Sequence, residues 1–294
     1  MKPLNICLIL SLASAPTAAA RPPSGPVDPE VAYVVLTGPG FELRVTNEDG
    51  TGAATIYKST APIRYDLAPR DQRKIVMVDG GRTLKLLTYD IGGNGGFTNI
   101  QVQTLHTTTK LMNSPDFSPD GSKVAVGAED ELVVYDLESG TAQTWTTSSY
   151  IWDLAWYKDG NAIAFIEPPN GGSTASLFEI SSLGGAQTHL VTLRNIDQVD
   201  AYRESPNALL LSYNDAAGNA LIGRWEGGTL SPSNLANRAV AFKASLNCDD
   251  SKLVYGAPDK SGSTVWYIRD LIQNSDRLYT KTPRANWTQM WPTC

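Results

Sequence analysis

The sequence is poor in the residues from which catalytic and metal sites are commonly built. Among 294 residues it has two histidines, His106 and His189, and neither stands near an Asp-x-His or Cys-His pattern. The GxSxG, HExxH, Walker-type and dinucleotide-binding glycine motifs are absent. The sequence therefore favours a protein without catalytic activity, cofactor or metal ion. A Ca²⁺ ion bound in a channel through the fold stays an open alternative.

Clusters of positive charge and long apolar runs are also missing. The formal net charge is −6 and no run of like charge occurs, whereas binding to a phosphate backbone needs clustered Lys and Arg. After the first twenty residues, no segment approaches the roughly 20 apolar residues of a membrane-spanning helix. We therefore expect a monomer with no nucleic-acid partner and no membrane span.

The first twenty residues, MKPLNICLILSLASAPTAAA, have the form of a secretory signal peptide. One Lys precedes an apolar stretch, and three alanines precede Arg21, as in an A-x-A-type cleavage site. We predict cleavage after Ala20, a linker over residues 21–27 and one domain over residues 28–294. The protein is then predicted to be periplasmic or secreted.

A short polar turn between two apolar runs recurs along the chain. The first clear copy is PDFSPDGSKVAV at residues 115–126, and the turns lie 39 to 50 residues apart. An alternating stretch such as ELVVYDLESG (131–140) follows each turn, and no convincing amphipathic helix is found. The other copies of the turn are YDLAPRDQRKIVMV (65–78), LAWYKDGNAIAF (154–165), DAYRESPNALLL (200–211) and ASLNCDDSKLVY (244–255).

Four short strands repeated every 40 to 45 residues or so are typical of a β-propeller blade. We predict an all-β fold, a six-bladed β-propeller of four-stranded antiparallel blades. The segment DPEVAYVV (28–35) lacks a preceding strand, and NWTQMWPTC (286–294) has the form of that strand. The first blade is therefore predicted to be shared between N- and C-terminal strands, which avoids open sheet edges.

Export gives the cysteines a predicted role. Without the signal peptide two remain, and Cys248 occupies the turn position that Pro119 holds in PDFSPDGSKVAV. Cys294 falls one place later in the corresponding turn of the neighbouring, shared blade. We predict a Cys248–Cys294 disulfide that pins the C-terminal strand; two separate free thiols are the alternative.

The acidic residues near the turn have two interpretations. Asp116, Ser118 and Asp120 lie close together in sequence and suggest a metal or nucleophile site. Asp120, however, recurs as Asp159 and Asp249 in other copies, and Asp in a turn accepts hydrogen bonds from nearby backbone amides. We predict that these residues build turns, because a catalytic residue need appear only once.

The turn followed by Lys-Val-Ala-Val, and the later Tyr-Asp-Leu-x-x-Gly, resemble the repeats of the TolB-like six-bladed propellers. The resemblance covers about residues 28 to 294. In that family a periplasmic member of the Tol–Pal system carries an additional N-terminal α/β domain, and its propeller binds a peptidoglycan-associated lipoprotein. Only RPPSGPV separates the predicted signal from the first strand here, so the resemblance implies a stand-alone propeller.

Binding residues are expected where the chain enters each inner strand, because propeller ligands usually meet one mouth of the channel. Aromatic, basic and mixed polar groups are typical of protein-recognition centres. We predict an exported, non-enzymatic binding protein for a protein or peptide of the cell envelope. The alternative function is that of a glycan-binding or glycan-cleaving propeller. For the tryptophans, the alternative is a structural role, in which they pack between blades. The candidate residues are Arg64, Asn113, Trp152, Asp153, Gln198, Lys243 and Trp287.

Overall fold

The computed structural model describes residues 31–47, 52–69, 71, 73–92, 96–168, 173–202, 205–232, 242–247, 250–260, 264–280 and 285–290. These residues form strands, turns and connections, and none of them lies in a helix that could cross a membrane. The predicted signal peptide and linker, Cys248 and Cys294 lie outside this part of the chain. The predictions for them stay predictions.

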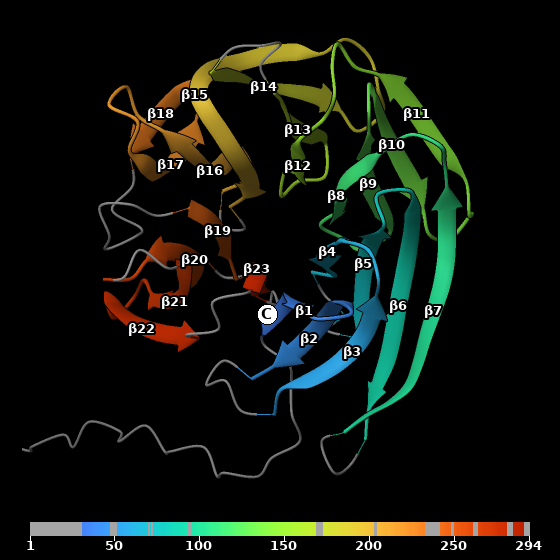
Figure 1. Cartoon of the computed structure of the whole chain (residues 1–294). Helices are drawn as coiled ribbons and strands as arrows, with labels where there is room; N and C mark the ends of the chain where they lie inside the picture. The colour runs from blue at the N-terminus through green and yellow to red at the C-terminus, as the bar shows by residue number, and fades with distance from the viewer. Residues whose placement is uncertain are drawn as a thin grey trace, which may run out of the picture.

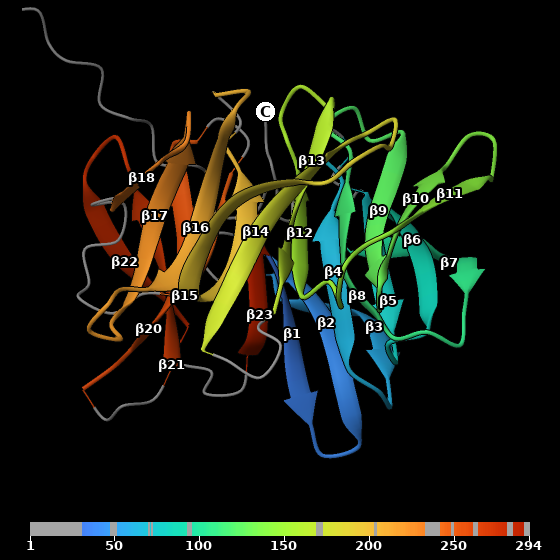
Figure 2. The same ribbon diagram turned by 90° about the horizontal axis from the view of Figure 1, so that it is seen from above.

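The described strands form five antiparallel sheets around a central axis (Figure 1), and most strands stand upright along it (Figure 2). The first sheet contains β1 (Val31–Thr37), β2 (Gly40–Thr46), β3 (Ala54–Ser59) and the last strand, β23 (Ala285–Met290). The second contains β4 (Ile63–Leu67), β5 (Lys74–Asp79), β6 (Thr83–Ile91) and β7 (Phe97–Thr107). The third contains β8 (Met112–Phe117), β9 (Lys123–Ala128), β10 (Glu131–Asp136) and β11 (Ala142–Thr146).

The remaining two sheets have seven and four strands. They are β12 (Asp153–Trp156), β13 (Ala162–Glu167), β14 (Thr174–Ser181), β15 (Thr188–Ala201), β16 (Ala208–Asn214), β17 (Ala220–Glu226) and β18 (Thr229–Pro232); and β19 (Phe242–Leu246), β20 (Lys252–Pro258), β21 (Thr264–Asp270) and β22 (Ser275–Thr280).

The seven-stranded sheet explains why five separate sheets are observed where six blades were predicted. The first part of β15 pairs with β14 up to Arg194, and the last part pairs with β16 from Gln198 onward. The register breaks between these residues, where Asn195 has a φ of 48°. The segment THLVTLRNIDQVDA contains no Gly or Pro, so the outer strand continues into the next inner strand without a turn. Dividing β15 at Asn195 gives six units of four strands.

Two further observations agree with this division. The inner strands β4, β8, β12, β15, β19 and β23 each contact the next, and β23 contacts β4, which closes a ring (Figure 1). Six apolar clusters of described residues each lie between two consecutive units. In β5, Ile75 and Met77 pack toward one neighbour while Val76 and Val78 pack toward the other. Burial of both faces explains the nearly continuous apolar sequence IVMV.

The ring closes through both ends of the chain. β23 pairs antiparallel with β1, with Met290 opposite Val31. Val31 is fully buried and belongs to an apolar cluster with Val254 and Trp266 of the β19–β22 sheet. The structure therefore confirms the all-β propeller and the predicted sharing of one sheet between N- and C-terminal strands.

The repeated polar stretch forms the predicted turn. The amide of Gly121 donates to the carbonyl of Ser118 at 2.8 Å, and Gly121 has a φ of 72°, a conformation that suits glycine. The Asp120 carboxylate accepts hydrogen bonds from the Ser118 hydroxyl at 2.6 Å and the Ser122 amide at 3.0 Å. Asp159 accepts one from the Asn161 amide in the same way. These aspartates therefore act locally, within their own turns.

Candidate functional site

The predicted binding residues lie near the first residues of the inner strands. Asn113 is in β8, Trp152 directly precedes Asp153 at the start of β12, and Arg64 and Gln198 are in β4 and the second part of β15. Lys243 and Trp287 belong to β19 and β23, but their side chains lie outside the described part. Of the five described residues Trp152 is exposed, while Asn113, Asp153 and Gln198 are buried. A hydrogen bond joins Asn113 to Trp152.

A bulge in β8 holds the chain that carries Trp152. Asn113 pairs with Gly127, but the register shifts before Asp116, and Ser114 has a φ of 40°. The Asn113 side-chain amide and the Ser114 hydroxyl both donate to the carbonyl of Trp152, the latter at 3.3 Å. A left-handed non-glycine residue costs about 1–3 kcal/mol and often occurs at functional sites. The bulge thus fixes Trp152 at the expense of local strain.

Gly127 permits this close approach. A Cβ atom built there would lie 2.6 Å from the Cβ of Ile151, far closer than two carbons can approach. The backbone amide of Trp152 also donates to the carbonyl of Ile166 at 2.8 Å. The segment Ile151–Trp152 is therefore held by two sheets at once, which makes the position of Trp152 well defined.

Asp153 is a buried carboxyl at the centre of this arrangement. It is 5% exposed, and it accepts a hydrogen bond from the amide of Val199 at 3.0 Å. Burial raises the pKa of Asp153 to about 7 against the opposing effect of hydrogen bonds from Ser114 and Val199. The positive charge of Arg64 also acts to lower the pKa of Asp153, and the negative charge of Asp197 acts to raise it. Arg64 and Asp197 therefore both lie within electrostatic range of Asp153.

A cavity of about 410 Å³ opens beside Asp153, between β12–β14 and β15–β17. The cavity lies at the break in β15, because the three consecutive residues at that break, Asn195, Ile196 and Asp197, line it. Trp152 is 41% exposed and forms part of the wall, so it does not pack away between sheets. The lining residues are Trp152, Pro168, Ala175, Asn195, Ile196, Asp197, Ser212, Tyr213, Asn214 and Ala220.

Two buried polar atoms lie behind the wall of this cavity. The hydroxyl of Ser212 and the Oε1 atom of Gln198 have no hydrogen-bond partner among the residues that the structure describes. The two residues are opposite each other in the β15–β16 pairing. Along β16, Leu209, Leu211 and Tyr213 pack on the cavity side and Ala208 and Leu210 on the side of the β19–β22 sheet, so the Ser212 side chain points away from the cavity.

Sequence reasoning missed the walls of this cavity. Ser212 lies in the apolar run ALLLSYN of a middle strand, where a single Ser gives no signal. Gln198 was predicted at the start of an inner strand, but its neighbours Asn195 and Asp197 were not singled out, and the structure places them at the break in β15. The absence of Gly and Pro there was the one available clue.

A second set of aspartates links neighbouring sheets. The Asp66 carboxylate accepts a hydrogen bond from the backbone amide of Phe117 at 2.8 Å. Asp116 accepts one from the amide of Trp156 at 2.6 Å, and Asp200 accepts one from the amide of Leu246 at 3.4 Å. Asp153 and Val199 make the same kind of bond. Each carboxylate thus accepts an N–H from the next inner strand around the ring. Asp116, grouped with the turn residues on sequence, therefore belongs to this inter-sheet set, and it acts neither in a turn nor as a nucleophile.

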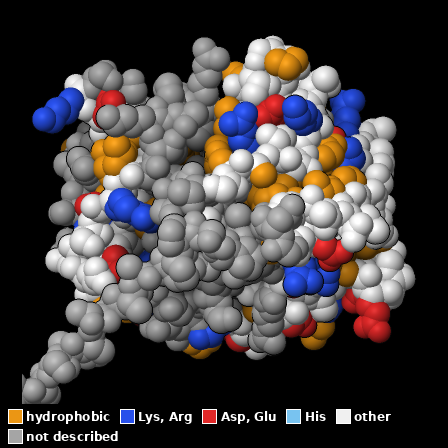
Figure 3. Space-filling view, turned by 90° about the horizontal axis from the view of Figure 1, so that it is seen from below, with side chains coloured by type: hydrophobic (Ala, Val, Ile, Leu, Met, Phe, Trp, Pro, Cys, Tyr) orange, Lys and Arg blue, Asp and Glu red, His pale blue; other side chains and the backbone are white. Residues whose placement is uncertain are grey.

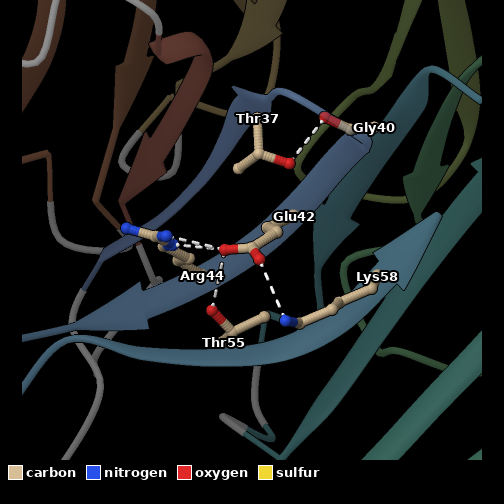
Figure 4. Close-up of polar contacts among 6 residues, drawn as sticks. All are labelled: Thr37, Gly40, Glu42, Arg44, Thr55 and Lys58. Atoms are coloured by element: carbon tan, nitrogen blue, oxygen red, sulfur yellow. Dashed lines mark hydrogen bonds and ion pairs between the residues drawn. The ribbon is translucent and has the colours of Figure 1, made fainter. Parts of the chain in front are cut away.

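A cluster of charges on the outer part of the first sheet is a second candidate (Figure 4). Glu42 accepts hydrogen bonds from Arg44 at 2.6 and 2.9 Å and from Thr55 at 3.1 Å, and Lys58 lies 3.1 Å away. Hydrogen bonding to Arg44 and then Lys58 lowers the pKa of Glu42 to about 2. A carboxylate this acidic is a poor proton donor or acceptor near neutral pH.

Among the described residues, charge and metal-ligating side chains are spread out. On the described part of the face in Figure 3, side chains of both signs are interspersed. In the same described ranges, no three His, Cys, Asp or Glu side chains converge as metal ligands would. The cavity beside Trp152 is the candidate functional site, because a predicted binding residue with an exposed aromatic side chain lines it.

The sheets and the closed ring of inner strands define an all-β propeller. The structure is similar to TolB from Acinetobacter baumannii, with a TM-score of 0.66 and 18% identity over 90% of this chain and 67% of that chain. It is also similar to a protein designated TolB from Agrobacterium tumefaciens, with a TM-score of 0.63 and 13% identity over 90% of this chain and 99% of that chain. No family model and no curated protein sequence matches the chain. The chain therefore has a TolB-like propeller fold.

Proposed function

We propose that this protein is an exported, non-enzymatic binding protein that recognises a protein or peptide of the cell envelope. The proposed binding surface is the channel mouth predicted at Arg64, Asn113, Trp152, Asp153, Gln198, Lys243 and Trp287. Among the described residues Trp152 is its exposed member, and the buried Asn113, Asp153 and Gln198 lie behind it. The observation that carries the proposal is the cavity wall at Trp152, where the indole is exposed and the backbone carbonyl of the same residue accepts hydrogen bonds from Asn113 and Ser114. Tryptophan is among the residues that most often anchor protein interfaces.

The carboxyl groups support binding over catalysis. Asp153 and Asp197 are two carboxyl groups within electrostatic range of each other, and a pair of carboxyl groups at the scissile bond is the pattern of many glycosidases. Asp153, however, is buried, accepts a backbone amide and does not line the cavity. A ligand in the cavity thus meets one carboxylate of the pair, whereas hydrolysis of a glycosidic bond needs both.

Glycan binding without cleavage is the second candidate. Trp152 with Asn195 and Asn214 in one cavity offers an aromatic face and side-chain amides, which suit a sugar ring and its hydroxyls. A glycan ligand would involve the same residues, so the two proposals differ in ligand chemistry and share the site.

Photo-crosslinking in the native envelope tests the proposal. A photo-crosslinking residue replaces Trp152 in the full chain, and the matched control carries it at Leu183, which is 85% exposed in the turn after β14. We expect a discrete crosslinked protein from position 152 and none from position 183. Equal background from both positions would overturn the proposal, and crosslinked material that is removed by glycosidases but not by proteases would favour the glycan alternative.

A further inference from the structure

The cavity beside Trp152 has an uncompensated negative charge. Asp197 is its charged lining residue, and it is exposed on the segment where β15 changes partner strand. No hydrogen bond or ion pair to the Asp197 carboxylate is found within the described ranges. Glu42, Asp120 and Asp136 differ in this respect, since each of these three carboxylates accepts several hydrogen bonds.

The walls around this carboxylate are apolar and aromatic. Trp152 and Tyr213 line the cavity together with Ile196, Ala175 and Pro168. Asn195 and Asn214 also line the cavity and add side-chain amides beside the carboxylate. A ligand that fits should therefore combine an apolar stem with a positive charge and N–H donors.

We propose that this cavity receives the guanidinium side chain of an arginine in a peptide partner. The proposal rests on the proposed peptide-binding function and names the group that is recognised. A guanidinium is planar and weakly hydrated, so it can stack on an indole while donating hydrogen bonds to a carboxylate. Its methylene stem would lie along the apolar wall. A lysine ammonium supplies fewer donors and a more strongly hydrated charge.

Size and charge agree with this occupant. A volume of about 410 Å³ falls within the range of roughly 300–1,000 Å³ common for ligand sites, which leaves room for the side chain and its flanking backbone. Arg64 is within electrostatic range of Asp153 but does not line the cavity. Asp197 therefore sets the sign of the charge that the cavity wall presents. A neutral sugar would leave this carboxylate without a counter-charge.

Titration of the full chain with capped tripeptides tests the proposal. The probes are alanine-arginine-alanine amide and the same peptide with lysine or with citrulline, which keeps the shape of arginine but lacks its charge. Binding is measured by calorimetry and by the fluorescence of Trp152 relative to Trp152→Ala. We expect the arginine peptide to bind most tightly, and Asp197→Asn to weaken it about tenfold through loss of a charge-assisted contact.

Two further variants set the scale. Trp152→Ala is expected to weaken binding of the arginine peptide about threefold, because an exposed cation–π contact is modest. Glu138→Gln removes the same formal charge from the exposed turn after β10 and is expected to change nothing. Thermal unfolding of each variant confirms that the propeller is folded.

The outcomes separate this inference from the proposed function. Equal affinity for the arginine and citrulline peptides, or an unchanged affinity in Asp197→Asn, would overturn the arginine pocket. Saturable binding of a chitin disaccharide that competes with the arginine peptide at Trp152 but is insensitive to Asp197→Asn would also overturn it. If position 152 still captured a protein in the envelope, the proposed function would stand without the arginine pocket. If the arginine peptide bound as expected and position 152 captured no protein, the arginine pocket would stand and the proposed envelope function would be overturned.

Discussion

Glu42 on the outer part of the first sheet and Asp153 on an inner strand are carboxyl groups with opposite electrostatics. Hydrogen bonds from Arg44, Lys58 and Thr55 keep Glu42 ionised and lower its pKa to about 2. Burial of Asp153 favours its neutral form and raises its pKa to about 7. Neighbouring positive charge stabilises the Glu42 carboxylate, whereas the buried Asp153 carboxyl is held by a hydrogen bond from a backbone amide.

The difference reflects what each region has to hold together. The partners of Glu42 lie on β2 and β3, so that cluster stays within one sheet (Figure 4). Asp153 and the related Asp66, Asp116 and Asp200 instead join one sheet to the next. In a propeller the outer strands are wide apart while the inner strands converge, so direct inter-sheet hydrogen bonds are available near the axis. We infer that the inner carboxyls fix the angle between sheets.

The largest expected effect concerns pH and Asp153. Its pKa is higher in the folded protein than in the unfolded chain, so its neutral form contributes stability that is fully present below about pH 4 and is lost as the pH rises through about 7. Asp153→Asn keeps an oxygen acceptor for Val199 without the charge. We expect this variant to be more stable than wild type at pH 8 by up to about 4 kcal/mol, with little difference at pH 4.

Urea unfolding at both pH values measures this effect. Glu42 provides the contrast, because its contribution has the opposite sign: it is present above about pH 4.5 and lost as the pH falls toward 2. A penalty from Asp153→Asn that was the same at pH 4 and pH 8 would show that the carboxyl contributes through geometry alone.

Removal of an inter-sheet acceptor is expected to have the next largest effect. Asp116→Ala leaves the amide of Trp156 without its acceptor, and Trp156 is buried, so we expect a loss of about 2–3 kcal/mol in the free energy of unfolding. Asp116→Asn retains an acceptor and should lose much less. The control Asp136→Ala removes a carboxylate that serves an exposed turn, and chemical denaturation of the three variants should rank them in that order. A cost in Asp136→Ala as large as in Asp116→Ala would contradict an inter-sheet role.

The fold could be predicted from the sequence because its signals are local and repeated. The turn around Asp120 and Gly121 forms through contacts among neighbouring residues, and Asp71 and Asp159 accept the same kind of backbone hydrogen bond in two other copies. Pairing of β23 with β1 was also predictable, since both terminal segments match the repeat. The continuity of β15 was not, because a strand that passes from one unit to the next leaves no turn signal.

The site was less predictable, since it depends on departures from the repeat. Asn113 and Trp152 were recognised by their position before an inner strand, but the bulge at Ser114 that joins them arises from a left-handed backbone at an ordinary residue. The role of Asp116 was missed for a related reason. Its partner, the amide of Trp156, is 40 residues away, and such a contact has no local sequence pattern.

The smallest expected effect is that of Glu42→Gln, and it sharpens the comparison through salt. Arg44 and Lys58 are 35% and 73% exposed, so their pairing with Glu42 should contribute about 1 kcal/mol or less. At 1 M salt the Debye length falls to about 3 Å, and the cost of Glu42→Gln should then nearly disappear. The cost of Asp116→Ala should persist, because its hydrogen bond to Trp156 lies between packed sheets where ions do not penetrate. Urea unfolding of both variants at low salt and at 1 M NaCl, pH 7, measures the two costs side by side. If both costs fell in parallel, the inner carboxyls would be acting as surface charges, and their proposed role in fixing the angle between sheets would be wrong.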